Sequence, residues 1–252
     1  MSFVAPKLSG SWSEEQVLAL QERFEDRDAT DLLTWADREL DGPVMLASSF
    51  GLEDVVLIDL VARLDLDIQV FSLDTGRLHQ ETYDVIEAIR RRYEVDIAIY
   101  FPDTTRVEAM VREKGPNSFY DSVENRKECC YLRKVEPLKR ALDGSSAWVT
   151  GLRRDQNVTR NKTPKIEIDR GHRGILKLNP LADWSANDVR QHIERFDVPY
   201  NELHDRGFPS IGCAPCTRPV EAGEDPRAGR WWWENPESKE CGLHTKASRG
   251  SS

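Results

Sequence analysis

Long apolar segments are missing from this sequence of 252 residues. No apolar run approaches the roughly 18 residues that a membrane-spanning helix needs. The N-terminal stretch MSFVAPKLSGSWSEEQ also lacks the charged and then apolar pattern of a secretory signal. We therefore expect a cytoplasmic protein with no membrane partner. Cytoplasmic thiols are kept reduced, so paired cysteines there serve as metal ligands or redox groups more often than as structural disulfides.

An excess of basic residues is missing as well, because the net charge is −9. This charge argues against nucleic acid as a partner, since nothing would attract a polyanion broadly. An anionic small molecule would have to be gathered by local clusters. Such clusters occur at Arg153-Arg154, at 160–162, and around Arg218, Arg227 and Arg230.

Strand and helix patterns alternate along the chain after a helical N-terminal region. Strands are predicted at 44–47, 68–73, 97–101, 147–152, 165–169 and 175–178. Helices are predicted at 13–40 (two helices), 54–64, 79–93, 106–114, 124–142 with an interruption at Pro137, and 185–196. This alternation is typical of an α/β fold with a mostly parallel sheet flanked by helices. The length fits one domain over 1–219 followed by a partly mobile C-terminal tail over 220–252.

Three predicted loops follow strands at the edge where a parallel sheet binds its ligands. The first, Ser48–Asp54, offers small residues before a helix, where backbone N–H groups can cradle an anion. It lacks both the GK[ST] ending of a Walker loop and the GxGxxG fingerprint. The second is Leu73–Arg77, in which Asp74 and Thr75 can hold a ribose or a base, and the third is Gly151–Gln156. Each loop alone could be an ordinary turn, but three together favour a nucleotide.

Four of the five cysteines form two close pairs, Cys129-Cys130 and Cys213-Ala-Pro-Cys216. Together they can supply four thiolates to zinc or to an iron–sulfur cluster. Adjacent residues rarely direct both sulfurs at one tetrahedral ion, whereas a cubane cluster offers several iron corners. Iron–sulfur is therefore favoured over zinc. A thioredoxin-like redox pair is less favoured, because polar residues rather than a buried strand precede Cys213.

The fifth cysteine, Cys241, lies in the segment Lys239-Glu-Cys-Gly-Leu-His244. A thiol attacks as the thiolate, and a nearby cation lowers the pKa of a cysteine below its ordinary value. Lys239 and His244 are close enough in sequence to act in this way. Cys241 is therefore a candidate nucleophile.

These motifs together resemble those of the assimilatory adenylyl-sulfate reductase family, the iron–sulfur branch of the sulfonucleotide reductases. The resemblance spans 48–244 and rests on the CC and CxxC pairs, KECGLH at 239–244, LDTGR at 73–77, CAPCTRP at 213–219 and GRWWW at 229–233. It implies the adenine nucleotide α-hydrolase-like fold. It also implies a 4Fe-4S cluster, one per subunit, held by Cys129, Cys130, Cys213 and Cys216.

The resemblance implies thioredoxin-dependent reduction of adenosine 5′-phosphosulfate to sulfite and AMP through an S-sulfocysteine, in sulfate assimilation and cysteine biosynthesis. The implied catalytic residues are Cys241, His244 and Lys134. The implied substrate-binding residues are Ser48, Ser49, Gly51, Leu73, Asp74, Thr75, Gly151, Arg160, Arg227 and Arg230. The partners would be the nucleotide and thioredoxin or a similar thiol donor, and a homo-oligomer stays open.

Three alternatives remain at this point. The nearest is a reductase for the 3′-phosphorylated nucleotide, or an enzyme that accepts both substrates. A zinc-bearing ATP-using ligase or thiolase acting on RNA is less favoured, because Glu53 and Asp54 would repel a triphosphate and no basic groove is evident. A redox-sensor module is least favoured, because it would not need nucleotide loops.

Overall fold

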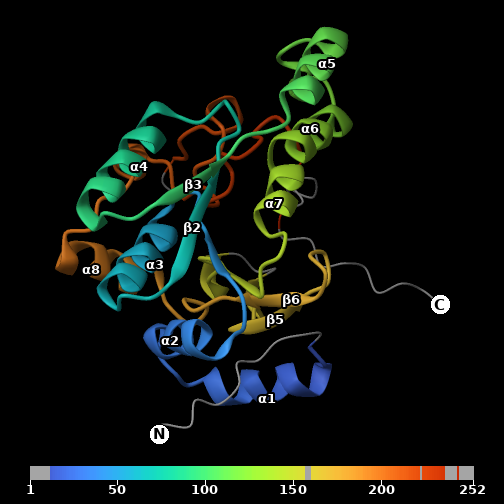
Figure 1. The fold of residues 1–252 in the computed structure, drawn as a ribbon. Coiled ribbons are helices and arrows are strands. Elements are labelled where there is room, and N and C mark those ends of the chain that lie inside the picture. The colour runs from blue at the N-terminus through green and yellow to red at the C-terminus, as the bar shows by residue number, and fades with distance from the viewer. Residues whose placement is uncertain (1–11, 157–159, 222, 236–242, 244–252) are drawn as a thin grey trace, which may run out of the picture.

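The structure is a computed structural model in which residues 12–156, 160–221, 223–235 and 243 are described. A six-stranded sheet with the order β3-β2-β1-β4-β6-β5 crosses its centre (Figure 1). The strands are β1 (Val44–Ala47), β2 (Ile68–Leu73), β3 (Ile97–Tyr100), β4 (Ala147–Val149), β5 (Ile166–Asp169) and β6 (Ile175–Leu178). Every neighbouring pair is parallel except β5 with β6. The predicted mostly parallel sheet is confirmed.

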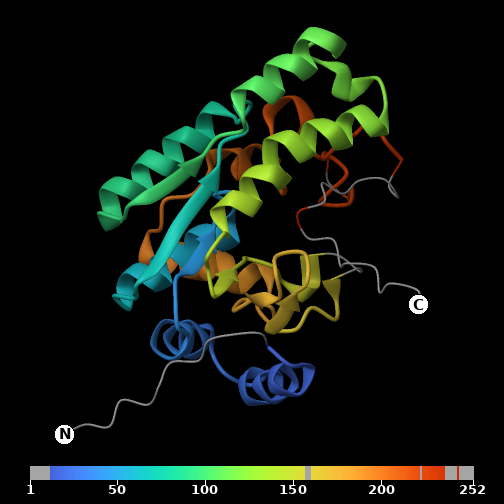
Figure 2. The same cartoon turned by 45° about the vertical axis from the view of Figure 1, so that its right-hand side comes forward.

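Helices cover both faces of this sheet. The α-helices in the described part of the chain are α1 (Glu14–Phe24), α2 (Ala29–Glu39), α3 (Leu52–Arg63), α4 (Gln80–Tyr93), α5 (Thr104–Lys114), α6 (Val123–Cys130), α7 (Glu136–Ala141) and α8 (Ala186–Phe196). One layer contains α3 packed against α4 and α8, while α7 packs on β2 and β3 from the other side (Figures 1 and 2). α1 lies against β5. Ser13 and Ser185 begin α1 and α8 with complete capping boxes.

Two apolar clusters fix these layers. The larger one lies on the α3 side, where Val55, Val56, Leu57 and Ile58 are fully buried, because these four consecutive apolar positions cover most of the circumference of the helix. The smaller one lies under α7 and consists of Met45, Phe71, Leu138, Ala141, Leu142 and Trp148. The two clusters hold the ends of β1, β2 and β4 at one edge of the sheet, where the loop residues discussed below are found.

The helix predicted over 124–142 is broken at a different place from the one expected. α6 ends at Cys130, a π-helical turn η2 (Tyr131–Val135) follows, and α7 continues through Pro137. The prediction of an interruption at Pro137 is wrong, because this proline lies in the first turn of α7, where its missing N–H costs little. Single π turns inside helices are frequent at functional sites.

Part of the predicted tail packs on the domain. Trp231 is 1% exposed, and an isolated bridge pairs Thr217 with Arg230. Leu243 packs against the smaller apolar cluster. Cys241 and His244 lie outside the described residues, so their roles stay predictions.

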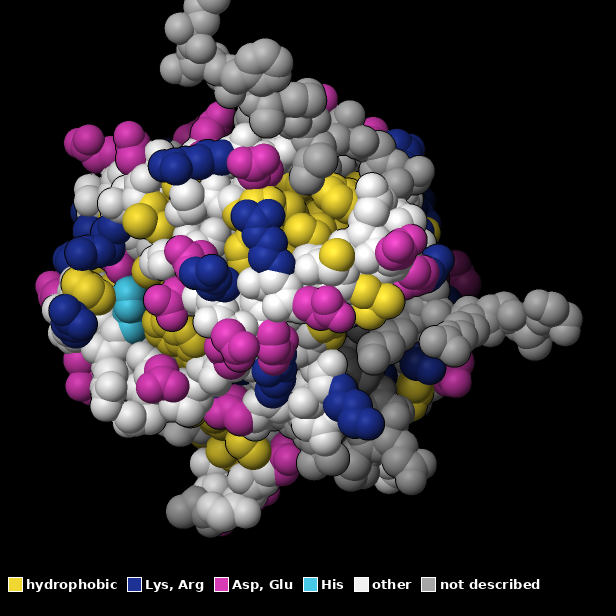
Figure 3. Space-filling view, turned by 90° about the horizontal axis from the view of Figure 1, so that it is seen from below, with side chains coloured by type: hydrophobic (Ala, Val, Ile, Leu, Met, Phe, Trp, Pro, Cys, Tyr) yellow, Lys and Arg dark blue, Asp and Glu magenta, His cyan; other side chains and the backbone are white. Residues whose placement is uncertain are grey.

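No helix in the described part of the chain is long and apolar enough to cross a membrane. The face of the molecule seen from below carries Lys and Arg side chains interspersed with Asp and Glu (Figure 3). On this face the charges of the two signs are mixed, rather than separated into one acidic and one basic area.

Candidate functional site

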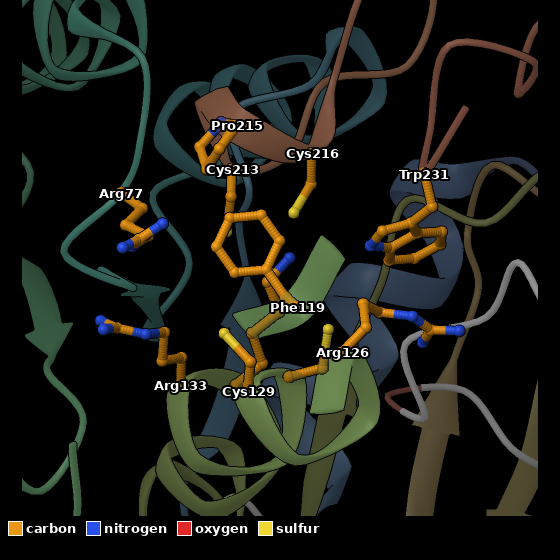
Figure 4. Close-up of a pocket in the computed structure, with 11 residues that line it drawn as sticks. Arg77, Phe119, Arg126, Cys129, Arg133, Cys213, Pro215, Cys216 and Trp231 are labelled. Atoms are coloured by element: carbon orange, nitrogen blue, oxygen red, sulfur yellow. The ribbon is translucent and has the colours of Figure 1, made fainter. Parts of the chain in front are cut away.

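Both cysteine pairs line one pocket, although about 80 residues separate them in sequence. Cys129 and Cys130 end α6, whereas Cys213 directly precedes the short turn η6 (Ala214–Cys216) and Cys216 ends it. Figure 4 shows Cys213 and Cys216 across the pocket from Cys129. Cys130, Cys213 and Cys216 are buried, Cys129 is half-buried, and all four are thiols rather than disulfides. The predicted grouping of the four cysteines is therefore present in the fold.

The turn that carries Cys213 and Cys216 is held by backbone hydrogen bonds from several segments. The Ala214 N–H donates to the Arg77 carbonyl at 2.8 Å, which ties the turn to the loop after β2. The Cys216 N–H donates to the Cys213 carbonyl at 2.9 Å. The Trp231 N–H donates to the Cys216 carbonyl at 3.1 Å, which adds the C-terminal segment. The position of the second cysteine pair therefore depends on residues on both sides of it.

Four thiols and two buried N–H donors line the pocket. Among the described residues, no set of three or more His, Cys, Asp or Glu side chains is arranged around a single ion position. The pocket that the four thiols line is partly open to solvent. Trp231 Nε1 and Arg133 Nε line this pocket as buried donors without a protein acceptor. Four soft ligands together with orphaned N–H donors suit an anionic iron–sulfur group.

Positive charge around the pocket acts on the thiols. Burial acts to raise the pKa of Cys213, but Lys134, the Thr75 hydroxyl, Arg230 and Arg133 together lower that pKa below its ordinary value. Burial and the neighbouring charge of Cys213 raise the pKa of Cys216 to about 12. The pKa values of the two thiols of this pair are thus shifted in opposite directions.

The loop after β2 forms one wall of the cysteine pocket. Thr75 Oγ1 lies 3.2 Å from Cys213 Sγ, and Arg133 Nη1 donates to the Thr75 carbonyl at 2.6 Å. Asp74 accepts hydrogen bonds from the Tyr83 hydroxyl at 3.0 Å and from the Gly76 N–H at 2.7 Å. The predicted contacts of Leu73, Asp74 and Thr75 with adenosine stay a prediction. In the protein alone, Asp74 shapes the loop and Thr75 faces a cysteine.

In the loop after β1, a carboxylate of the protein itself accepts hydrogen bonds from the loop donors. Ser48 and Ser49 precede Gly51, which caps the N-terminus of α3. The Asp54 carboxylate accepts from the Ser49 N–H at 2.6 Å and from the Ser49 hydroxyl at 2.9 Å. Burial raises the pKa of Asp54 to about 6, against the opposing effect of the Ser49 hydrogen bonds. The loop donors predicted to cradle a phosphate are thus partly engaged by a carboxylate.

The loop after β4 meets the first turn of α3. A Cβ on Gly151 would lie 2.7 Å from both Asp54 Oδ1 and Glu53 Cβ, so the backbone can pass here only as glycine. Arg153 Nε donates to Glu53 Oε1 at 2.8 Å, and Gln156 Nε2 donates to the same oxygen at 3.1 Å. Glu53 is therefore charge-compensated by Arg153 rather than free to repel an anion.

The three arginines predicted to bind the substrate and the predicted catalytic Lys134 lie in different places. Arg160 Nη1 donates to Gln156 Oε1 at 2.5 Å, which joins it to the Glu53–Arg153 pair. Arg230 is buried and donates from Nη1 to the Ser210 hydroxyl and the Ile211 carbonyl, while Lys134 lines the cysteine pocket. Arg227 is half-buried in the segment before Arg230. The substrate contacts of all four residues stay predictions.

Three arginines at the cysteine pocket were not predicted from the sequence. Arg77, Arg126 and Arg133 line it together with Phe119 and Trp231 (Figure 4). Arg126 precedes Cys130 by four residues and Arg133 follows Cys129 by four, so helical periodicity alone could have placed both beside a cysteine. Arg77 adjoins Thr75 in the loop after β2, and only the tertiary fold brings it to this pocket.

Known proteins resemble this chain over most of its length. The model of the phosphoadenosine phosphosulfate reductase domain matches residues 43–219. The adenosine 5′-phosphosulfate reductase of Allochromatium vinosum is 53% identical over 218 residues, which cover 86% of this chain and 84% of that protein. The phosphate complex of phosphoadenylyl-sulfate reductase from Candida auris superimposes with a TM-score of 0.74 at 29% identity, over 84% of this chain and 100% of that one. FMN adenylyltransferase from Candida glabrata shares the fold alone, with a TM-score of 0.52 at 16% identity, over 91% of this chain and 80% of that one.

Proposed function

The chain belongs to the phosphoadenosine phosphosulfate reductase family, and on this basis we propose that it reduces adenosine 5′-phosphosulfate to sulfite and AMP in sulfate assimilation. The observation that carries the proposal is the meeting of Cys129-Cys130 with Cys213 and Cys216 in a pocket that Lys134 also lines. The reaction would run in the cytoplasm, where thiol donors are kept reduced. We retain 1–219 as the nucleotide-binding and cysteine-site domain, and 220–252 as the segment that brings the nucleophile.

We assign the four pocket cysteines to a 4Fe-4S cluster. Support comes from their number, their burial and the two orphaned donors Trp231 Nε1 and Arg133 Nε beside them. When bound, the cluster would supply a compact charged group that shapes and polarises the site. Lys134 would transmit this polarisation to the substrate, because it lines the cysteine pocket and its positive charge would attract an anionic nucleotide.

The first chemical step in this proposal is attack by the Cys241 thiolate on the sulfur of the nucleotide. A sulfur–sulfur bond forms, the bond from sulfur to the bridging oxygen breaks, and AMP leaves with that oxygen and the bonding electrons. The enzyme then carries an S-sulfocysteine at Cys241. Arg227, Arg230, Lys134 and His244 would offset the repulsion between the two anions and stabilise the charge on the leaving phosphate.

The second step consumes a dithiol of the thioredoxin type. One donor thiolate attacks Cys241 Sγ, the sulfur–sulfur bond to the sulfonate breaks, and sulfite leaves with the electron pair. The second donor thiol resolves the mixed disulfide and returns Cys241 as a thiol. The donor loses two electrons and becomes a disulfide, while the sulfonate sulfur is reduced to sulfite.

Nucleotide binding would use the three loops at the sheet edge. Ser48, Ser49 and Gly51 would line the phosphate loop, while Leu73, Asp74 and Thr75 would hold the adenosine. Gly151 allows the third loop to approach α3, and Arg160 is hydrogen-bonded to Gln156 of that loop. Support for this arrangement is the convergence of the first and third loops on Glu53 and Asp54.

The 3′-phosphorylated nucleotide is the second candidate substrate, because the matching family model and the Candida auris structure carry its name. The four cysteines favour the unphosphorylated nucleotide, since family members without them favour the other substrate. Comparing kcat/KM for the two nucleotides at one donor concentration decides between them.

Incubation with adenosine 5′-phosphosulfate and no thiol donor tests the proposed reaction directly. Mass spectrometry should find one added sulfonate on the peptide that contains Cys241, and AMP should be released in equal amount. The Cys241→Ser variant should gain no sulfonate. Sulfonate on that variant, or no sulfonate on the wild type, would overturn the proposal.

A further inference from the structure

Arg126 and Glu234 form an ion pair that is closed off from solvent. The Arg126 side chain is 0% exposed and the Glu234 side chain is 3% exposed. Arg126 Nε donates to Glu234 Oε1 at 2.8 Å, and Nη2 donates to Oε2 at 2.8 Å. This two-point geometry fixes the orientation of both side chains as well as their distance. The pair joins α6 to the segment that leads toward Cys241.

Several contacts connect the Arg126–Glu234 pair to the cysteines. The Arg126 guanidinium carbon lies 4.7 Å from the ring centre of Trp231, which is a cation–π contact. The Glu234 N–H donates to the Trp231 carbonyl at 2.9 Å, and the Trp231 N–H donates to the Cys216 carbonyl at 3.1 Å. Arg126, Trp231 and both cysteine pairs line the same pocket. Glu234 is thus linked to both cysteine segments through two residues.

A gain in folding stability does not by itself explain a buried ion pair of this kind. Removing two charges from water costs about as much as their attraction returns, and apolar replacements of similar size are often neutral or stabilising. A buried pair can instead select one arrangement of the segments that it joins. The nearby pair of Arg218 with Glu224 shows the contrast, because its side chains are 36% and 35% exposed and it lies on the surface.

We propose that Glu234 is a positioning residue, whose buried ion pair with Arg126 fastens the start of the Cys241-bearing segment to the cysteine helix. The inference rests on the proposed function, because it takes Cys241 as the nucleophile. In this arrangement the helix that carries Cys129 and Cys130 is joined through Arg126 to Glu234, which precedes Cys241 by seven residues in sequence. Small errors in the placement of a reacting group are costly, so the attachment acts on the rate rather than on nucleotide affinity.

Glu234→Gln tests this role, with Glu224→Gln as the matched control in the same segment. The glutamine keeps the shape of the side chain and removes its charge. We expect Glu234→Gln to lower kcat by about tenfold to a hundredfold. The nucleotide dissociation constant should stay within about twofold of the wild-type value. Glu224→Gln should match the wild type in both. An unchanged kcat in Glu234→Gln, or an equal fall in Glu224→Gln, would overturn the proposal.

A double variant separates positioning from misfolding. Arg126→Met combined with Glu234→Met removes both charges and leaves no unpaired charge inside the protein. We expect it to unfold at a temperature near that of the wild type, yet to keep the low kcat of Glu234→Gln. Recovery of the wild-type kcat in the double variant would show that the ion pair does not position the segment.

Hydrogen exchange gives a readout that does not depend on turnover. The Trp231 amide donates to the Cys216 carbonyl and the Glu234 amide donates to the Trp231 carbonyl, so the peptide 229–235 should exchange slowly in the wild type. Exchange should accelerate by about tenfold or more in Glu234→Gln and stay unchanged in Glu224→Gln. Equal exchange in all three proteins would refute the attachment. If the wild type forms no sulfite at all, the proposed function fails, and the exchange result still decides whether the pair fastens this segment.

Discussion

Thr75 Oγ1 lies 3.2 Å from Cys213 Sγ, so a residue of the predicted nucleotide loop contacts the cysteine site directly. The hydroxyl is also one of the groups that lower the pKa of Cys213. A residue predicted as a substrate contact thus has a second partner in the protein itself. The nucleotide loop after β2 and the cysteine pocket share a wall, and a change in one reaches the other through this contact.

Thr75→Val should weaken the retention of the proposed iron–sulfur cluster at the cysteine site. Valine keeps the shape of threonine but loses the hydroxyl that supports Cys213, and loss of such a supporting contact commonly costs about 10- to 100-fold in metal affinity. Thr75→Ser keeps the hydroxyl and is the matched control. Iron and acid-labile sulfide per chain, measured during dialysis against a chelator, should fall faster for Thr75→Val than for Thr75→Ser. Equal loss from the two variants would contradict a role for the hydroxyl.

Asp54→Asn should change the pH dependence of stability. The pKa of the Asp54 carboxyl rises from 3.8 to about 6 on folding, so the folded state binds more protons in this range. The free energy of unfolding of the wild type therefore falls as the pH rises through the range, by about 3 kcal/mol from this group in all and about half of that above pH 5. Asparagine cannot titrate and lacks this loss.

Urea unfolding of both proteins at pH 5 and pH 7.5 measures the difference. The stability of Asp54→Asn relative to the wild type should be higher at pH 7.5 than at pH 5. A relative stability that does not change between these two pH values would contradict the assigned burial of the carboxylate.

Gly151→Ala should destabilise the protein. The added Cβ would lie 2.7 Å from Asp54 Oδ1 and from Glu53 Cβ, so the loop after β4 or the first turn of α3 must shift. Overpacking of this kind costs about 1–3 kcal/mol. At Gly51 an added Cβ meets nothing closer than 3.8 Å, so Gly51→Ala is the control for unfolding. Gly151→Ala should lose more stability in urea unfolding than Gly51→Ala does.

Leu243→Ala should slow the sulfonation of Cys241. Leu243 packs against the smaller apolar cluster under α7, and it lies two residues after the proposed nucleophile. Loss of a partly buried leucine side chain removes about 1 kcal/mol of apolar contact, which corresponds to roughly a fivefold slower reaction if the contact forms in the reacting state. Leu243→Met fills a similar volume and should react at nearly the wild-type rate. Single-turnover release of AMP compares the three proteins, and equal rates would show that this contact does not matter.

The sequence predicted the parts of the fold that depend on local pattern. The apolar runs of β1 and β2 and the helix predicted over 185–196 depend only on neighbouring residues, and each element was found where it was expected. The predicted end of β4 at 152 was too late by three residues. The reason is the close approach of Gly151 to α3, which no local pattern reveals.

The candidate site divides in the same way. Spacing was enough to group the four cysteines, because adjacent residues and a CxxC pair each bring two sulfurs close together. The partners of those cysteines were harder to predict. Glu234 contacts Arg126 across 108 residues, and Trp231 reaches the pocket only because the chain folds back over Cys216. The internal hydrogen bonds of Asp74 and Asp54 were also not predicted, since a carboxylate in a loop or in the first turn of a helix can bind a ligand or a nearby backbone N–H equally well.

The π turn η2 sets how far α7 is rotated about the helix axis relative to α6. An added residue turns everything beyond it by about 100° around the helix axis relative to a regular α-helix. On one side of the turn α6 presents Cys129 and Cys130 to the pocket, and on the other side α7 presents Leu138 and Ala141 to the sheet. The number of residues between these two faces therefore cannot change even by one without misaligning one of them. Deleting one residue within 131–135 would leave α6 and α7 helical, yet the thiols and the apolar face could no longer both meet their partners.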